Sequence, residues 1–93
     1  MITAFVMMNV EREHITDVPD QLLRIKGVTE VYSVAGDYDL IALVRVKEAD
    51  ELASVVTRQF AKVPGISKTK TQIAFACYSN YDLENMFKIG FKD

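Results

Sequence analysis

The stretches RIKGVT (residues 24–29) and KVPGIS (residues 62–67) are two copies of one pattern in a chain of 93 residues. Each contains a basic residue, a β-branched residue, any residue, glycine, a second β-branched residue and a hydroxyl residue. Glycine commonly ends helices and β-branched residues favour strands, so each copy marks a helix followed by a strand. The repetition at two equivalent joints predicts a duplicated helix–strand unit.

The segments around these joints predict four strands. Residues 1–10 are apolar on both alternating sides, which is typical of a strand buried on both faces. Residues 28–35 and 40–46 are rich in β-branched residues and are separated by the turn signal GDYD at residues 36–39. Residues 66–78, polar in the first half and apolar in the second, predict the fourth strand.

Two helices are expected between the strands. Pro19 is tolerated only in a first turn, so the first helix begins near Asp17 or Val18, and Gly27 ends it. Residues 48–62 predict the second helix. The order βαββαβ indicates an α+β, ferredoxin-like fold, with a four-stranded antiparallel sheet and both helices on one face. The first helix is marked by apolar residues at spacings of three, four and three: Ile15, Val18, Leu22 and Ile25.

Residues 78–93 lie outside the duplicated unit. Their apolar residues have helical spacing and predict a short helix, with an extra edge strand over residues 86–91 as the alternative. We therefore expect one domain over residues 1–77 and a C-terminal extension over residues 78–93. Because helices would cover only one face of a sheet that is apolar on both, we also expect sheet-on-sheet dimerisation.

The charge of the chain argues against direct contact with nucleic acid. Eleven basic and thirteen acidic residues give a formal charge of −2, and the basic residues form no stripe. Affinity for DNA depends heavily on neutralisation of phosphates by lysine and arginine. We expect no direct DNA binding by this chain.

The cysteine content and the N-terminal residues indicate the compartment. A single cysteine, Cys77, excludes an intramolecular disulfide, and its place late in an apolar strand predicts a buried, inert thiol. Residues 1–10 are too short for a membrane span and lack the basic region of a signal peptide. We expect a cytoplasmic protein without membrane contact.

The sequence offers no constellation for catalysis or metal binding. His14 is the only histidine and has no cysteine nearby, so a surface histidine is expected. Phosphate-binding loops, dinucleotide fingerprints and nucleophile elbows are all missing from the sequence. Asp37 and Asp39 could form an acid–base pair, but turn carboxylates more often bind backbone amides. We expect no enzymatic activity, no cofactor and no metal.

The turn at residues 36–39 carries more side-chain oxygens than a turn requires. A carboxylate beside exposed backbone amides can bind an ammonium group while the amides bind a carboxylate, and these groups are the two ends of an α-amino acid. Thr69 and Thr71 lie on one face of the predicted fourth strand and add neutral hydroxyls. A solvated hairpin is the alternative interpretation of these residues alone.

The run GVTEVYSVAGDYDL (residues 27–40) resembles the effector-binding domain of the Lrp/AsnC family, also called the RAM domain. Pro64-Gly65-Ile66 and Thr69-Lys70-Thr71 carry the same resemblance, which covers residues 1 to about 76. Family regulators have a helix-turn-helix before this domain, so the chain is similar to stand-alone members without that half. The resemblance implies dimers formed through the sheets, often assembled into octameric or decameric rings.

In this family small effectors, commonly amino acids, bind between dimers, next to the hairpin loop and the fourth strand. The resemblance implies that the start of the second helix, near Ala49, borders the site. Asp39 with Tyr38 would orient the ammonium group, and loop amides with Thr71 would bind the carboxylate. By position the site would be lined by Gly36, Asp37, Tyr38, Asp39, Thr69, Thr71, Gln72, Ile73 and Ala74.

The expected function is that of a sensing protein, which binds an amino acid or related metabolite at subunit interfaces and changes assembly state or partner. Two alternatives stay open. One is a small dimeric enzyme of the α+β-barrel type, with its pocket between sheet and helices. The other is an oligomerisation adaptor that assembles with full-length Lrp/AsnC regulators.

Overall fold

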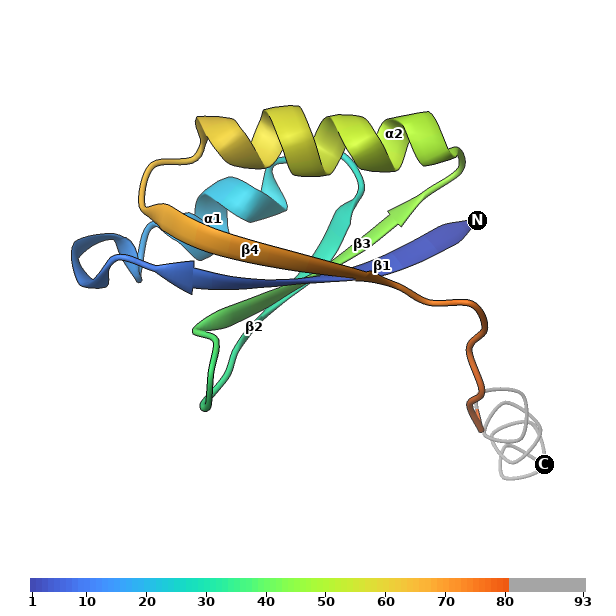
Figure 1. The fold of residues 1–93 in the computed structure, drawn as a ribbon, viewed down its shortest axis with the longest axis horizontal. Helices are drawn as coiled ribbons and strands as arrows, with labels where there is room; N and C mark the ends of the chain where they lie inside the picture. Colours follow the sequence, from blue (N-terminus) through green and yellow to red (C-terminus); the bar gives the residue numbers. More distant parts are fainter. Residues whose placement is uncertain (81–93) are drawn as a thin grey trace, which may run out of the picture.

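The computed structural model describes residues 1–80 as a four-stranded antiparallel sheet with helices on one side (Figure 1). The strands lie in the order β2-β3-β1-β4, so β1 is central and pairs with both β3 and β4. This arrangement confirms the predicted ferredoxin-like βαββαβ fold. The strands are β1 (Ile2–Val10), β2 (Val28–Ser33), β3 (Leu40–Val46) and β4 (Ile66–Ile73).

The helices begin where the sequence predicts. α1 (Val18–Leu23) has Pro19 in its first turn and Asp17 at its N-cap position, although the Asp17 side chain makes no capping hydrogen bond. α1 ends four residues before Gly27, so its predicted C-terminal end was wrong. The second helix runs from Ala49 to Lys62 as α2 (Ala49–Ser54), a π-helical segment η2 (Val55–Gln59) and a 3-10 turn η3 (Phe60–Lys62). Another 3-10 turn, η1 (Arg12–His14), follows β1.

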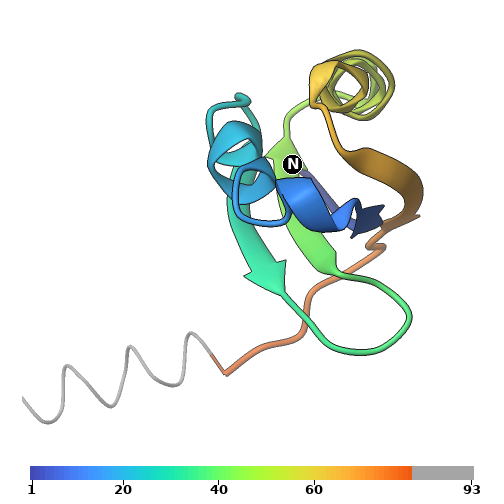
Figure 2. The same ribbon diagram turned by 90° about the vertical axis from the view of Figure 1, so that its left-hand side faces the viewer.

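The core lies between the sheet and this helical layer, which covers one face of the sheet (Figure 2). Alternate residues of β1, namely Ala4, Val6 and Met8, are fully buried. They share the core with Leu22 of α1 and Phe60 of η3. Burial of each of the larger apolar side chains in this layer contributes roughly 1.5–3 kcal/mol to folding.

The prediction that β1 is buried on both faces was wrong for the single chain. Phe5 is 41% exposed, and Met7 is half-buried. Their cross-strand partners on the same face are Leu43 and Ile41, and Tyr32 lies opposite Ile41 on β2. These five residues form what we call the open face. No helix covers this face, because both helices pack on the opposite side of the sheet.

The two sequence repeats have equivalent structures. Gly27 and Gly65 both have positive φ angles, 102° and 98°, which favour glycine. Each carbonyl oxygen accepts a hydrogen bond from a residue at the end of a neighbouring strand: Arg45 N–H for Gly27 and Glu11 N–H for Gly65. The duplication read from the sequence is therefore a duplication of backbone geometry.

The hydroxyl that ends each repeat also has an equivalent role. The register of β2 against β3 skips Thr29, and that of β4 against β1 skips Ser67. At each bulge the hydroxyl donates to a carbonyl of the neighbouring strand, Thr29 to Leu43 and Ser67 to Asn9, both at 3.2 Å. Because a bulge leaves ladder groups unpaired, a hydroxyl residue is favoured at each position.

Several predicted strand ends were too long. β2 ends at Ser33 and β4 ends at Ile73, rather than at residues 35 and 78. Cys77 consequently lies beyond β4 and is exposed, so the predicted buried thiol was wrong. The prediction of a helix or strand within residues 81–93 falls outside the described residues. Within residues 1–80, the helices are all too short to cross a membrane.

Candidate functional site

The loop between β2 and β3, residues 34–39, is fixed to the end of the central strand. Val34 N–H donates to the carbonyl of Asp39 at 3.0 Å, which closes the loop. Asp39 N–H donates to the carbonyl of Met8 at 2.9 Å, which connects the loop to β1. Four of the predicted site residues are therefore held at one end of the sheet, on the side away from the helices (Figure 2).

The Asp39 side chain supplies a hydrogen-bond acceptor at a position where β3 has no residue to pair with β1. The β1–β3 pairing ends at Met8 and Leu40, so Val10 N–H has no backbone acceptor from β3. The Asp39 Oδ2 atom accepts that hydrogen at 2.8 Å. Because Val10 is only 8% exposed, this donor would otherwise be buried without a partner. Asp39 thus has a structural role as well as its predicted place in the site.

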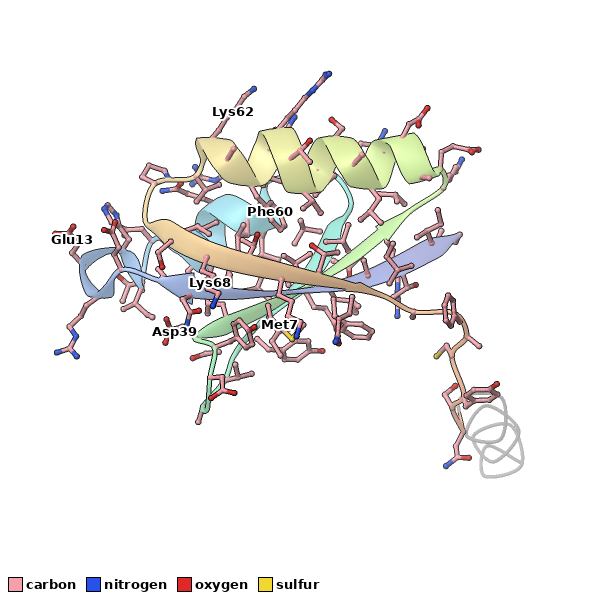
Figure 3. The ribbon with its side chains drawn as sticks, viewed as in Figure 1. Met7, Glu13, Asp39, Phe60, Lys62 and Lys68 are labelled. Atoms are coloured by element: carbon pink, nitrogen blue, oxygen red, sulfur yellow. The ribbon has the colours of Figure 1, made fainter. Side chains whose placement is uncertain are left out.

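Asn9 connects the loop to β4. Its side-chain Nδ2 atom donates to the carbonyl of Asp37 at 2.9 Å, and its own carbonyl accepts the Ser67 hydroxyl. Asn9 also pairs with Lys68 of β4, so loop, β1 and β4 meet at this residue. Figure 3 shows Asp39 and Lys68 at this end of the sheet. Sequence reasoning missed Asn9, although a lone amide in an otherwise apolar strand was a signal.

The exposed part of the loop offers a charged side chain and accessible backbone groups. Gly36 and Asp37 are exposed, whereas Tyr38 and Asp39 are half-buried. Gly36 has a φ of 119°, and nothing lies within 4 Å of the position where a Cβ would be. The loop therefore presents one free carboxylate, that of Asp37, and an open glycine backbone to whatever approaches the end of the sheet.

The predicted β4 residues are divided between the two faces of an edge strand. Thr69 and Thr71 lie opposite the buried residues Met8 and Val6, which places both hydroxyls on the helix side, as their shared face predicted. Thr69 lines a small cavity of about 240 Å³ between β4 and the end of the second helix. Gln72 lies opposite Phe5 and therefore at the rim of the open face.

The end of β4 is far from the loop. Ile73 is 56% exposed and pairs with Ala4, and Ala74 N–H donates to the Thr3 carbonyl at 2.9 Å. These contacts are at the start of β1, whereas the loop contacts its last residues. At about 3.3 Å per residue, Ile73 lies roughly 16 Å along β4 from Lys68. One chain therefore does not bring the loop together with Gln72, Ile73 and Ala74.

A second cavity, of about 1030 Å³, lies elsewhere in the described part of the chain. It opens between the end of α1, the end of β3 and the second helix, and its lining includes Lys26, Lys47 and Glu51. None of the predicted site residues lines it, and neither histidine, tyrosine nor aspartate is found in that lining. The cavity thus lacks the groups expected for the enzyme alternative.

His14 lies in a more acidic setting than the sequence suggested. Its Nε2 atom is 3.9 Å from a Glu13 carboxylate oxygen, and its Nδ1 atom is 4.0 Å from one of Asp17. Potential ligand atoms of Glu11, Glu13 and His14 lie within 4.8 Å of one another. Exposed carboxylates commonly lie this close without an ion, so the absence of a metal site stays a prediction.

The open face carries one perturbed titratable group. The Tyr32 hydroxyl donates to a Glu30 carboxylate oxygen at 2.7 Å. This hydrogen bond raises the pKa of the Tyr32 phenol above its ordinary value, because ionisation would remove the donor beside a carboxylate. The Arg45 charge acts in the opposite direction and lowers that pKa. The phenol is therefore a neutral donor at the rim of the open face.

The fold defines a small α+β domain of the ferredoxin-like class, with the β2–β3 loop fixed at one end of its sheet. The chain belongs to the Lrp/AsnC family, because residues 3–82 match the sequence model of the Lrp/AsnC ligand-binding domain. An HTH-type transcriptional regulator of Pyrococcus horikoshii, PH1916, is 34% identical over 76 residues. That alignment covers 78% of this chain and 51% of the regulator. The chain thus spans about half the length of the curated relatives it matches.

Solved structures agree with this assignment. TTHA0845 from Thermus thermophilus has a TM-score of 0.79 and 40% identity, over 85% of this chain and 99% of that one. A feast or famine regulatory protein of M. tuberculosis, Rv3291c, complexed with L-methionine, has a TM-score of 0.71 and 29% identity. This second match covers 86% of our chain and 54% of Rv3291c. PH1916 and Rv3291c are both named as regulators and not as enzymes.

Proposed function

We propose that this chain is an amino-acid-sensing regulatory subunit, which binds its effector between subunits of a cytoplasmic homo-oligomer. One observation carries the proposal: the predicted site residues of the loop and of the end of β4 lie at opposite ends of the sheet. A second subunit that places its β4 beside the loop would complete the site. Dimers assembled into an octamer or decamer would provide such contacts.

The chemistry of the loop supports an amino acid as the ligand. Asp37 is exposed and carries the negative charge that an ammonium group requires. The exposed Gly36 backbone allows close approach of a carboxylate to the loop amides. Rv3291c, a relative with the same fold, forms a complex with L-methionine, and the family model is that of a ligand-binding domain.

The remaining residues receive the following roles in the proposed site. Asp39 accepts the Val10 amide through Oδ2, and a carboxylate has further lone pairs with which it can accept an ammonium hydrogen beside Tyr38. Thr71, which is half-buried on the helix side of β4, binds the effector carboxylate across the interface. Ile73 and Ala74 surround the effector side chain.

A thermal-shift screen of the twenty amino acids, followed by calorimetry with the best ligand, tests the proposal. We expect one or a few amino acids to stabilise the protein, by about 2.7 kcal/mol at a concentration one hundred times the dissociation constant. Asp37→Asn should weaken that binding at least tenfold, because charge-assisted hydrogen bonds to an ammonium group contribute roughly 1.5–3 kcal/mol.

The matched control is Asp20→Asn, which removes the same charge from an exposed position on α1. Its affinity should equal that of the unmodified protein. If no amino acid shifts the melting temperature, the effector class is wrong. If Asp37→Asn and Asp20→Asn bind the ligand equally well, the loop is not part of the site.

A further inference from the structure

We infer that residues 74–80 form an arm that crosses to a second copy of this chain and covers the partner's open face. This inference rests on the homo-oligomer of the proposed function and specifies which parts of two subunits meet. It assigns the contact to an apolar segment outside the sheet, in addition to any contact between the open faces themselves.

The direction of the arm is the first observation. After β4 ends at Ile73, the chain leaves the sheet on the side opposite the helices (Figures 1 and 2). The loop over residues 34–39 projects on that same side at the other end of the sheet (Figure 1). The open face thus lies between two projections, and a second sheet placed against it would lie alongside the arm.

The composition of the arm is the second observation. The segment from Ile73 to Asn80, IAFACYSN, contains no charged residue. Phe75 and Tyr78 are 105% and 93% exposed, so the aromatic side chains contribute nothing to the packing of their own subunit. Aromatic residues placed this way in a short, uncharged segment are typical of interface anchors.

The arm can contribute a large share of the area that a dimer interface requires. A stable interface buries about 800 Å² on each partner. The open face alone is a modest patch, because Leu43 is only 6% exposed and Phe5 is 41% exposed. Two buried aromatic side chains add roughly 300–500 Å² per arm. The arm therefore supplies the apolar area that the open face lacks.

A second copy is the partner that satisfies both surfaces at once. In a two-fold dimer each contact occurs twice, so each arm covers the partner's open face while its own open face is covered in return. The rim of the open face carries Lys70 and Arg45, which lie opposite Met7 and Thr3. Glu30, which accepts the Tyr32 hydroxyl, lies on the same face, so the rim carries both signs of charge and an uncharged segment such as the arm meets no net repulsion there.

Cys77, the only cysteine of the chain, lies on the arm and is exposed, so it reports directly on the arm's position. Unmodified chain is mixed with a tagged chain that carries Cys77→Ser and Ile41→Cys, and a short bismaleimide is added. We expect a mixed cross-link between the two chains. If the first tagged chain fails to fold, a second one carries Cys77→Ser and Lys70→Cys, whose cysteine lies at an exposed position on the rim. The control is a tagged chain with Cys77→Ser and Arg58→Cys, whose cysteine lies on the helical layer; it should cross-link to the unmodified chain no more than background.

A second measurement tests the energetic role of the arm. Sedimentation equilibrium should show at least a tenfold weaker dimer for Phe75→Ser/Tyr78→Ser, because interface aromatics are the commonest hot spots and each occurs twice. Leu23→Ser, which removes a half-exposed apolar residue from α1, should leave the dimer unchanged. If the unmodified chain is a monomer, both the homo-oligomer and the arm contact are overturned. If it is a dimer with the same dissociation constant as the arm variant, and open-face cross-links stay at background, only the arm inference is overturned.

Discussion

Asp39 provides the most direct test of the role of the loop, because its carboxylate makes a structural hydrogen bond and also has a proposed role in ligand binding. Its Oδ2 atom accepts the Val10 N–H at 2.8 Å, where β1 extends beyond the first residue of β3. Asp39→Ala removes that acceptor and leaves the amide without a protein partner. Asp39→Asn keeps an oxygen at a similar position and removes only the charge.

The magnitude follows from the burial of the pair. Hydrogen bonds to charged groups contribute about 1.5–3 kcal/mol, and an unsatisfied buried donor costs a comparable amount. Because Asp39 is only half-buried, water can replace part of the interaction, and we expect Asp39→Ala to lower the free energy of unfolding by about 1–2 kcal/mol. Asp39→Asn should cost less than half as much, since the amide oxygen still accepts the Val10 hydrogen.

Urea denaturation at one fixed protein concentration measures both variants. For a domain of this size, a loss of 1–2 kcal/mol moves the urea midpoint down by roughly 1 M. Hydrogen exchange adds a local readout, because the Val10 amide should exchange faster in Asp39→Ala than in Asp39→Asn. The structural role of Asp39 is refuted if Asp39→Ala is within about 0.5 kcal/mol of the unmodified protein, or if both variants lose the same stability.

Four further substitutions have distinct expected outcomes. Gly36→Ala should cost about 1–2 kcal/mol from its positive φ alone, whereas Gly65→Ala should cost more in the same urea assay, since its Cβ would overlap a histidine side chain. Ser67→Ala should lower the free energy of unfolding by about 0.5–1.5 kcal/mol, because it removes the hydrogen bond to the Asn9 carbonyl at the bulge. An unchanged free energy of unfolding would show that this bond does not stabilise the fold. Glu30→Gln should lower the pKa of the Tyr32 phenol toward its ordinary value, measured by NMR of labelled tyrosine, and an unaltered pKa would rule out the carboxylate as the cause of the shift.

The fold was predictable because its signals are local and repeated. Glycine at residues 27 and 65 has positive φ in the structure, and Pro19 placed the start of α1 correctly. Element ends were less predictable, since they depend on tertiary partners. β4 stops at Ile73, opposite Ala4, although apolar residues continue: the Ala74 N–H still donates to the Thr3 carbonyl, and beyond that limit the chain leaves β1. The exposure of Cys77 follows from that limit and could not be inferred from hydrophobicity.

The site was predictable only in part. The sequence singled out the loop, but it carried no sign that the Asp39 carboxylate completes the end of a strand. Asn9 was missed for a related reason: its partners Asp37 and Ser67 are 28 and 58 residues away in the chain. Contacts of this range arise from the sheet register, which local sequence patterns do not specify.

The separation of the loop from the end of β4 has a consequence for how an effector would act. A ligand that touches both groups binds the assembled protein and not the isolated subunit. Its binding free energy then adds to the free energy of association, by about 2.7 kcal/mol for each site at one hundred times the dissociation constant. Reciprocity requires that the protein bind the effector more tightly as it assembles. An effector that binds with the same affinity at protein concentrations above and below the assembly midpoint would place the site within one subunit, contrary to the geometry of the sheet.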